Sequence, residues 1–156
     1  MISLYLMRHG QAGDAPRDDE RRLTERGRDD VRSIARRLAA IETGPAVLLS
    51  SPLPRALETA CIVAEETGLG APRVEPDLAP GSAPEFLLAL LRGCRGERAI
   101  FVGHMPDLGV FAAYLAWGGR GRAVNLTPGS VVRLRIARSS PDLHATLEGV
   151  MAPEER

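Results

Sequence analysis

Aromatic residues, cysteine and long apolar runs are scarce in this chain, and each shortage excludes a class of protein. Aromatic residues make up only 4% of the sequence, too few for the stacking platforms that bind single-stranded nucleic acid. No apolar stretch approaches the length of a membrane helix, and the short apolar run at the start lacks the preceding basic residues of a signal peptide. The two cysteines, Cys61 and Cys94, have no CxxC spacing and predict reduced thiols in a cytoplasmic protein.

The charge of the chain is balanced, with 20 lysine and arginine residues against 20 aspartates and glutamates. The positive charge is carried by arginine. A net charge near zero argues against bulk attraction to nucleic acid or to an anionic membrane, and we expect neither as a partner. The arginines of residues 17–37 alternate with acidic residues and indicate a solvated helix face. The length of 156 residues and the 44% apolar content suit a single domain over residues 1–156.

Apolar runs and helical stripes alternate along the chain. Strands are predicted at residues 2–7, 46–50, 73–75, 99–102, 131–136 and 145–151. Helices are predicted at residues 24–41, 53–68, 82–91 and 106–115, with N-caps at Thr24 and Ser82 and with Cys61 in the apolar stripe of the second helix. Residues 11–22 are expected to form a polar loop. This alternation predicts an α/β fold, a three-layer sandwich in which helices cover both faces of a mainly parallel sheet.

Polar residues follow three of the predicted strands at the point where each strand ends. The first group is Arg8-His9-Gly10, and the second is Ser50-Ser51-Pro52 with Arg55 one turn into the next helix. The third group is Gly103-His104-Met105-Pro106. Because the carboxyl ends of parallel strands share one edge of a sheet, we expect two arginines and two histidines to meet there.

Such a group of side chains suits the binding and transfer of a phosphoryl group. Guanidinium groups match the geometry of phosphate oxygens, and helix N-termini near Arg55 and Met105 would direct backbone N–H groups at an anion. A neutral imidazole is a nucleophile that can carry a phosphoryl group. Taken singly, His104 reads as a packing residue and Arg55 as a solvated helix residue. Their joint placement after separate strands favours an anion site.

The same residues resemble motifs of the histidine phosphatase superfamily, which has the phosphoglycerate-mutase-like fold. The motifs are Arg8-His9-Gly10, the run SPLPRALETA over residues 51–60, and the run VGHMP over residues 102–106. The run RRLTERG over residues 21–27 fits the R-x-L-T-x-x-G segment of the short branch, the SixA-type phosphohistidine phosphatases.

The resemblance implies a role for each matching residue. His9 would be the nucleophile that takes the phosphoryl group. Arg8, Arg55 and His104 would complete the phosphate pocket, and Arg21 would be a further phosphate contact. The resemblance implies no metal and no organic cofactor. Ligation of a metal by His9 and His104 is disfavoured because the neighbouring arginines would repel a cation.

Two departures from the family pattern bear on the substrate. Gln11 stands where many members have an acidic residue, and no carboxylate can be assigned as the acid that protonates a leaving group. The candidates are Asp14, Asp18, Glu75, Asp77 and Glu85. An alkoxide leaving group normally needs such an acid, whereas the nitrogen of phosphohistidine leaves as neutral imidazole once it is protonated. The sequence therefore favours phosphohistidine over a phosphate monoester.

The length of residues 69–97 also bears on the substrate, because this span is too short for a deep lid. An open site suits a phosphorylated protein, for example one of a signalling pathway, while small metabolites are usually enclosed. Two alternatives stay open: a small-molecule phosphomonoester phosphatase or mutase of the same superfamily, and a non-catalytic module that binds phosphorylated partners. Within residues 118–130, Asn125 and Thr127 either reach a ligand or belong to a surface connection.

Overall fold

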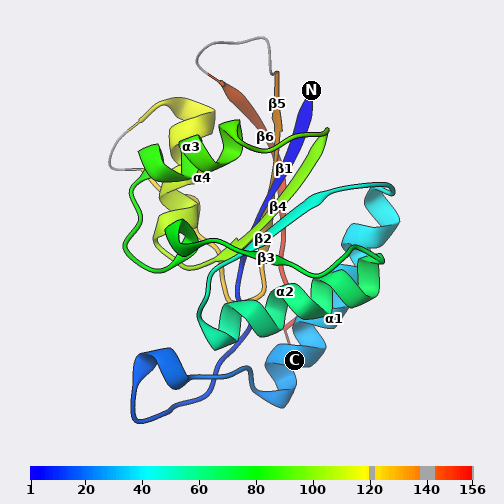
Figure 1. Cartoon of the computed structure of the whole chain (residues 1–156), viewed down its shortest axis with the longest axis vertical. Helices are drawn as coiled ribbons and strands as arrows, with labels where there is room; N and C mark the ends of the chain where they lie inside the picture. Colours follow the sequence, from blue (N-terminus) through cyan, green and yellow to red (C-terminus); the bar gives the residue numbers. More distant parts are fainter. Residues whose placement is uncertain (120–121, 138–142, 156) are drawn as a thin grey trace.

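The computed structural model describes residues 1–119, 122–137 and 143–155 and contains one mixed sheet. The strands are β1 (Ile2–Arg8), β2 (Val47–Ser50), β3 (Arg73–Val74), β4 (Arg98–Gly103), β5 (Val131–Ile136) and β6 (Ala145–Met151). They form a six-stranded sheet in the order β3-β2-β4-β1-β5-β6 (Figure 1). The pairs β1–β4, β2–β4 and β2–β3 are parallel, and β5 and β6 add two antiparallel pairs. The predicted, mainly parallel sheet is confirmed.

Helices cover both faces of this sheet (Figure 1). They are α1 (Glu25–Ile41), α2 (Pro54–Thr67), α3 (Pro84–Arg92) and α4 (Asp107–Trp117), with the short 3-10 helices η1 (Asp18–Glu20) and η2 (Pro76–Leu78). Alternate residues of β1 point to opposite faces, so Tyr5 and Met7 pack with α1 and α2 while Leu4 and Leu6 pack with α3 and α4. The predicted three-layer arrangement is confirmed. No helix in the described residues is long and apolar enough to cross a membrane.

The helix ends follow the sequence signals in part. Thr24 caps α1 as predicted, because its Oγ1 accepts a hydrogen bond from the N–H of Gly27 at 2.9 Å. Gly68 ends α2 in the left-handed conformation, with φ +74°. The predicted cap at Ser82 is wrong: Ala83 precedes α3, and the Ser82 N–H donates instead to the carboxylate of Asp107.

Two further local predictions need correction. Cys61 is exposed, because the buried stripe of α2 runs through residues such as Ala56, Ala60 and Val63. The predicted polar loop of residues 11–22 contains the turn η1, and Ala12 pairs with Leu23 in an isolated antiparallel bridge. The bridge folds this segment back over the edge of the sheet.

Gly27 allows the first turn of α1 to pack directly on the backbone of Gln11. A Cβ atom at position 27 would lie 2.1 Å from the carbonyl oxygen of Gln11. The N–H of Thr24 also donates to that carbonyl at 3.0 Å. The glycine of the R-x-L-T-x-x-G segment is therefore required by a close backbone approach, which fixes the chain just after His9.

We expect Gly27→Ala to destabilise the protein, although the same change in an ordinary helix is stabilising. The added methyl group forces the Gln11 backbone away, at a cost of about 1–3 kcal/mol in the free energy of unfolding. Urea denaturation measures this loss. Gly93→Ala is the matched control, because a Cβ there meets its nearest atom at an ordinary 3.5 Å. Equal stability of wild type and Gly27→Ala would contradict the close packing.

Candidate active site

The three polar groups predicted from the sequence meet at the carboxyl ends of β1, β2 and β4. They surround a surface cavity of about 280 Å³. The cavity is lined by Arg8, His9, Gln11, Ala12, Asp18, Arg21, Arg55, Pro80, His104, Met105 and Pro128. The structure thus brings all six predicted site residues, namely Arg8, His9, Arg21, Arg55, His104 and Met105, to one pocket.

Backbone hydrogen bonds continue past the strand ends and hold these segments together. The N–H of His9 donates to the carbonyl of Gly103 at 3.0 Å, and the N–H of Ser51 donates to that of Val102 at 2.9 Å. His104 follows directly after Gly103. The register of β4 against its two neighbours therefore sets the spacing between the two histidines, whose ring centroids lie 5.2 Å apart.

His9 is buried and held in one tautomer. Its Nδ1 lies 2.7 Å from the carbonyl oxygen of Gly10, and because a carbonyl only accepts hydrogen bonds, Nδ1 carries the proton. The Nε2 lone pair accepts a hydrogen bond from Nε of Arg55 at 3.3 Å. Burial, together with the charges of Arg55 and Arg8, lowers the pKa of His9 to about 4, against the smaller raising effect of the hydrogen bond to the Gly10 carbonyl. His9 is therefore a neutral imidazole at neutral pH.

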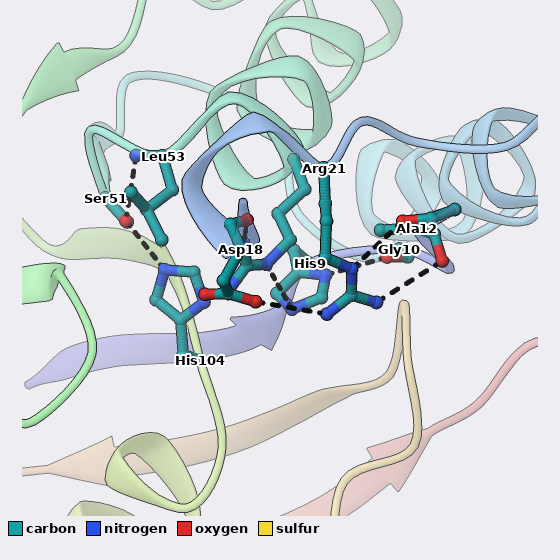
Figure 2. A network of polar contacts seen from close by, with 10 residues as sticks. His9, Gly10, Ala12, Asp18, Arg21, Ser51, Leu53 and His104 are labelled. Carbon is teal, nitrogen blue, oxygen red and sulfur yellow. Dashed lines mark hydrogen bonds and ion pairs between the residues drawn. The ribbon is translucent and has the colours of Figure 1, made fainter. Parts of the chain in front are cut away.

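His104 is also buried and neutral. Burial, followed by the proximity of His9 and of the Arg55 charge, lowers the pKa of His104 to about 3. Its Nε2 lies 2.7 Å from the hydroxyl oxygen of Ser51. Its Nδ1 is buried and has no hydrogen-bond partner among the described residues. Figure 2 shows the His104 side chain between Ser51 and Asp18.

Asp18 links two of the predicted phosphate-binding arginines. Arg55 donates to the backbone carbonyl of Asp18 at 2.8 Å and to its carboxylate at 3.1 Å. Arg21 donates to the other carboxylate oxygen of Asp18 at 3.4 Å (Figure 2). A hydrogen bond of 2.9 Å from Nε of Arg21 to the carbonyl of Gly13 fixes the arginine. The hydrogen bond from Arg55 is the main cause that lowers the pKa of Asp18. Asp18 is therefore ionised and does not hold a proton for a leaving group at neutral pH.

Arg8 is fixed by the segment before β5. Its Nη1 donates to the carbonyl oxygen of Leu126 at 2.9 Å, and the N–H of Gly129 donates to the carbonyl of His9 at 2.9 Å. The described part of residues 118–130 thus supports the site through its backbone, and Pro128 lines the cavity. Asn125 is exposed, and Thr127 bonds to Ser130. Residues 120 and 121 lie outside the described residues.

Sequence reasoning left three features of the site unassigned. Of the five carboxylates considered as acids, Asp18 alone lines the cavity, and Glu75 pairs with Arg73 at 2.9 Å. The contact between Ser51 and His104 joins residues 53 positions apart. Thr59 accepts a hydrogen bond from the N–H of Gly10 at 3.1 Å and donates to the carbonyl of Arg55 at 2.8 Å. A threonine one turn after Arg55 on the same helix face was the available signal for this last contact.

The described residues contain no group of three His, Cys, Asp or Glu side chains placed to hold a metal ion. The cavity instead gathers arginines and neutral imidazoles, which suit an anion.

Comparison with known proteins identifies the family. The sequence model of the histidine phosphatase superfamily (branch 1) matches residues 4–80. An uncharacterized protein of Picosynechococcus sp. is 35% identical over 153 residues, covering 94% of this chain and 93% of the relative. The structure of the protein histidine phosphatase SixA complexed with tungstate shares 27% identity, with a TM-score of 0.83 and 97% of each chain covered. A SixA structure from Nakamurella multipartitia has the same fold at 23% identity, with a TM-score of 0.81 over 97% of this chain and 96% of that one.

The chain therefore belongs to branch 1 of the histidine phosphatase superfamily.

Because two imidazoles are buried in the neutral form, we expect the protein to lose stability in acid. Histidines of the unfolded chain take up protons near pH 6.5, at their ordinary pKa of about 6.5, whereas His9 and His104 do so only at about 4 and about 3 in the folded protein. Between these pH values the unfolded chain binds more protons than the folded protein does. The free energy of unfolding therefore falls as the pH drops from about 6.5 toward about 4.

Urea midpoints at about pH 7 and about pH 5 measure this fall. His104→Gln removes one of the two groups and should make the fall smaller. The same fall in wild type and variant would contradict a buried neutral imidazole at position 104.

Proposed function

We propose that this protein is a phosphohistidine phosphatase that removes the phosphoryl group from a histidine of another protein through a covalent intermediate on His9. The observation that carries the proposal is the neutral His9 imidazole, whose Nε2 lone pair is directed at Arg55 in a cavity lined by three arginines. Arginines hold the anion and the imidazole attacks it. No metal or organic cofactor takes part in the proposed reaction.

In the first step, the lone pair of His9 Nε2 forms a bond to phosphorus. The bond between phosphorus and the substrate nitrogen breaks at the same time, and its electron pair goes to that nitrogen. The hydrogen bond from Nδ1 to the Gly10 carbonyl keeps the His9 ring in the tautomer that can attack, and it stabilises the positive charge that develops on the ring.

The arginines stabilise the charge on the transferring phosphoryl group. Arg8, Arg21 and Arg55 come from three different segments, and each is held by at least one hydrogen bond to a backbone carbonyl. Their positions are therefore set before substrate binds, which is the condition under which electrostatic stabilisation contributes most to the rate. Met105 lines the cavity just before the N-terminus of α4, whose backbone N–H groups would add to this stabilisation of an anion.

The leaving group favours a phosphohistidine over a phosphate monoester. Asp18 is the carboxylate of the cavity, and its pairing with Arg55 keeps it ionised. An alkoxide would leave without a proton donor, at a large cost. The imidazole of phosphohistidine leaves as a neutral ring when its second nitrogen already carries a proton, so this substrate needs no acid from the enzyme.

In the second step, a water oxygen forms a bond to phosphorus and the bond from phosphorus to His9 Nε2 breaks. The electron pair returns to Nε2, and both protons of the water leave with the phosphate or pass to solvent. His9 is restored as a neutral imidazole with its proton on Nδ1.

A protein substrate fits the shape of the site. Residues 69–97 form β3, η2 and α3, and from this span only Pro80 lines the cavity. α3 packs against the face of the sheet opposite to α2, and none of its residues lines the cavity. A side chain on a protein surface can therefore reach His9. The likeness to the protein histidine phosphatase SixA, at 27% identity, supports the same substrate class.

The proposal is tested by phosphate release from a phosphohistidine-bearing protein, with p-nitrophenyl phosphate and 3-phosphoglycerate assayed beside it. We expect kcat/KM to be highest for the phosphohistidine protein. Faster release from either monoester would overturn the substrate assignment. Faster release from 3-phosphoglycerate would also mean that a proton donor is present in the site, because its alkoxide leaving group needs a proton, whereas p-nitrophenolate leaves without one.

His9→Ala should abolish turnover and preserve anion binding. We expect a loss of about 10⁴-fold or more in kcat, with a Kd for tungstate within a few-fold of wild type, because the arginines stay in place. Rate assays and calorimetry measure the two quantities. His144→Ala, at an exposed histidine outside the cavity, is the matched control and should keep full activity. Appreciable turnover by His9→Ala would exclude His9 as the nucleophile.

A further inference from the structure

We propose that Ser51 is a positioning residue that holds His104 in the tautomer with its proton on Nδ1. Ser51 is the first residue after β2 and is fully buried. Its hydroxyl oxygen lies 2.7 Å from Nε2 of His104, and the same oxygen accepts the N–H of Leu53 at 3.2 Å (Figure 2). The functional consequence of this tautomer rests on the phosphatase activity proposed above.

The direction of the hydrogen bond follows from counting donors and acceptors. The hydroxyl group has one proton to donate, and Leu53 is already a donor to its oxygen. If Ser51 donates to His104, the hydroxyl proton, its oxygen and Nε2 are all satisfied. If His104 donated instead, the hydroxyl proton of Ser51 would be buried, and the described residues offer it no second partner. In that case the Nδ1 lone pair of His104 would also lack a partner, so two buried polar groups would be unsatisfied, against one, the Nδ1–H of His104, when Ser51 donates. Buried polar groups without partners are costly, so Ser51 is the donor.

A neutral imidazole has one N–H. When its Nε2 accepts a hydrogen bond, the ring proton must therefore be on Nδ1. His104 is neutral because burial lowers its pKa to about 3. Its Nδ1 is buried without a partner among the described residues, on a ring that lines the phosphate cavity. A phosphoryl oxygen would supply the missing acceptor. The other tautomer would present a lone pair to the anion and repel it.

The two histidines of the site thus have the same tautomer, with the proton on Nδ1, but direct different nitrogen atoms at the substrate. The Nδ1–H of His9 donates a hydrogen bond to the Gly10 carbonyl, and its Nε2 carries the lone pair. The Nε2 lone pair of His104 accepts a hydrogen bond from Ser51, and its Nδ1 carries the proton. One ring is therefore prepared to attack phosphorus and the other to donate to an oxygen of the same group.

Two-bond ¹H–¹⁵N correlation spectra of the histidine rings test this assignment directly, because the two neutral tautomers give different patterns. We expect wild-type His104 to show the Nδ1–H pattern without any ligand. Ser51→Ala should move His104 toward the Nε2–H pattern. It should also weaken tungstate binding and lower kcat/KM by about 10- to 100-fold, as for other groups that orient a histidine.

Two variants separate this role from a general loss of packing. Ser50→Ala removes a neighbouring buried hydroxyl that donates its hydrogen bond to the Ser51 carbonyl. It should leave the His104 pattern as in wild type. Ser51→Thr keeps the hydroxyl and should retain the Nδ1–H pattern.

An Nε2–H pattern for His104 in the wild type would overturn the proposal, as would an unchanged pattern in a folded Ser51→Ala protein. If Ser51→Ala does not fold, the wild-type spectrum alone decides. The spectrum requires no substrate, so a protein that shows the Nδ1–H pattern but does not hydrolyse phosphohistidine would refute the proposed function and leave the assignment of Ser51 standing.

Discussion

Parallel pairing of β4 with β1 on one side and β2 on the other is the constraint on which the site depends. It aligns three carboxyl ends at one edge, so that Arg8 pairs with Gly103 and Ser50 pairs with Val102. The backbone bonds from His9 and Ser51 to β4 extend this pairing beyond the strands. The two histidines and the serine are therefore fixed relative to one another by main-chain geometry. Side-chain contacts then need to adjust only ring orientation and protonation.

Burial and the positive charge of the arginines both lower the pKa of His9 and of His104. Both disfavour a protonated imidazole, so His9 and His104 are neutral, while the cations that hold an anion stay charged. Asp18 balances part of this positive charge in the free protein through Arg55 and Arg21. A phosphoryl group that enters the cavity would provide the same kind of partner for these arginines. The site is thus organised for an anion before any substrate binds.

Much of this arrangement could be predicted from the sequence because its signals are local. An apolar run that ends in Arg8 and His9 predicts a strand with polar residues at its carboxyl end, and Thr24 and Gly68 mark helix ends by their own hydrogen bonding and backbone preference. The pairing of Asp18 with Arg55 could not be predicted in the same way. Asp18 lies in a polar segment with several acidic residues, and only the turn η1 selects it from its neighbours.

The sequence by itself determined the order of strands and helices and the residues that stand at the strand ends. It also determined the family, since the residues that bind phosphate in such proteins lie in short motifs. The tertiary structure alone decided which partners those residues have: Leu126 for Arg8, Asp18 for Arg55 and Ser51 for His104. The reason is physical. Apolar periodicity and capping act between residues a few positions apart, whereas the state of a buried imidazole depends on atoms that only the packed sheet brings within hydrogen-bonding distance.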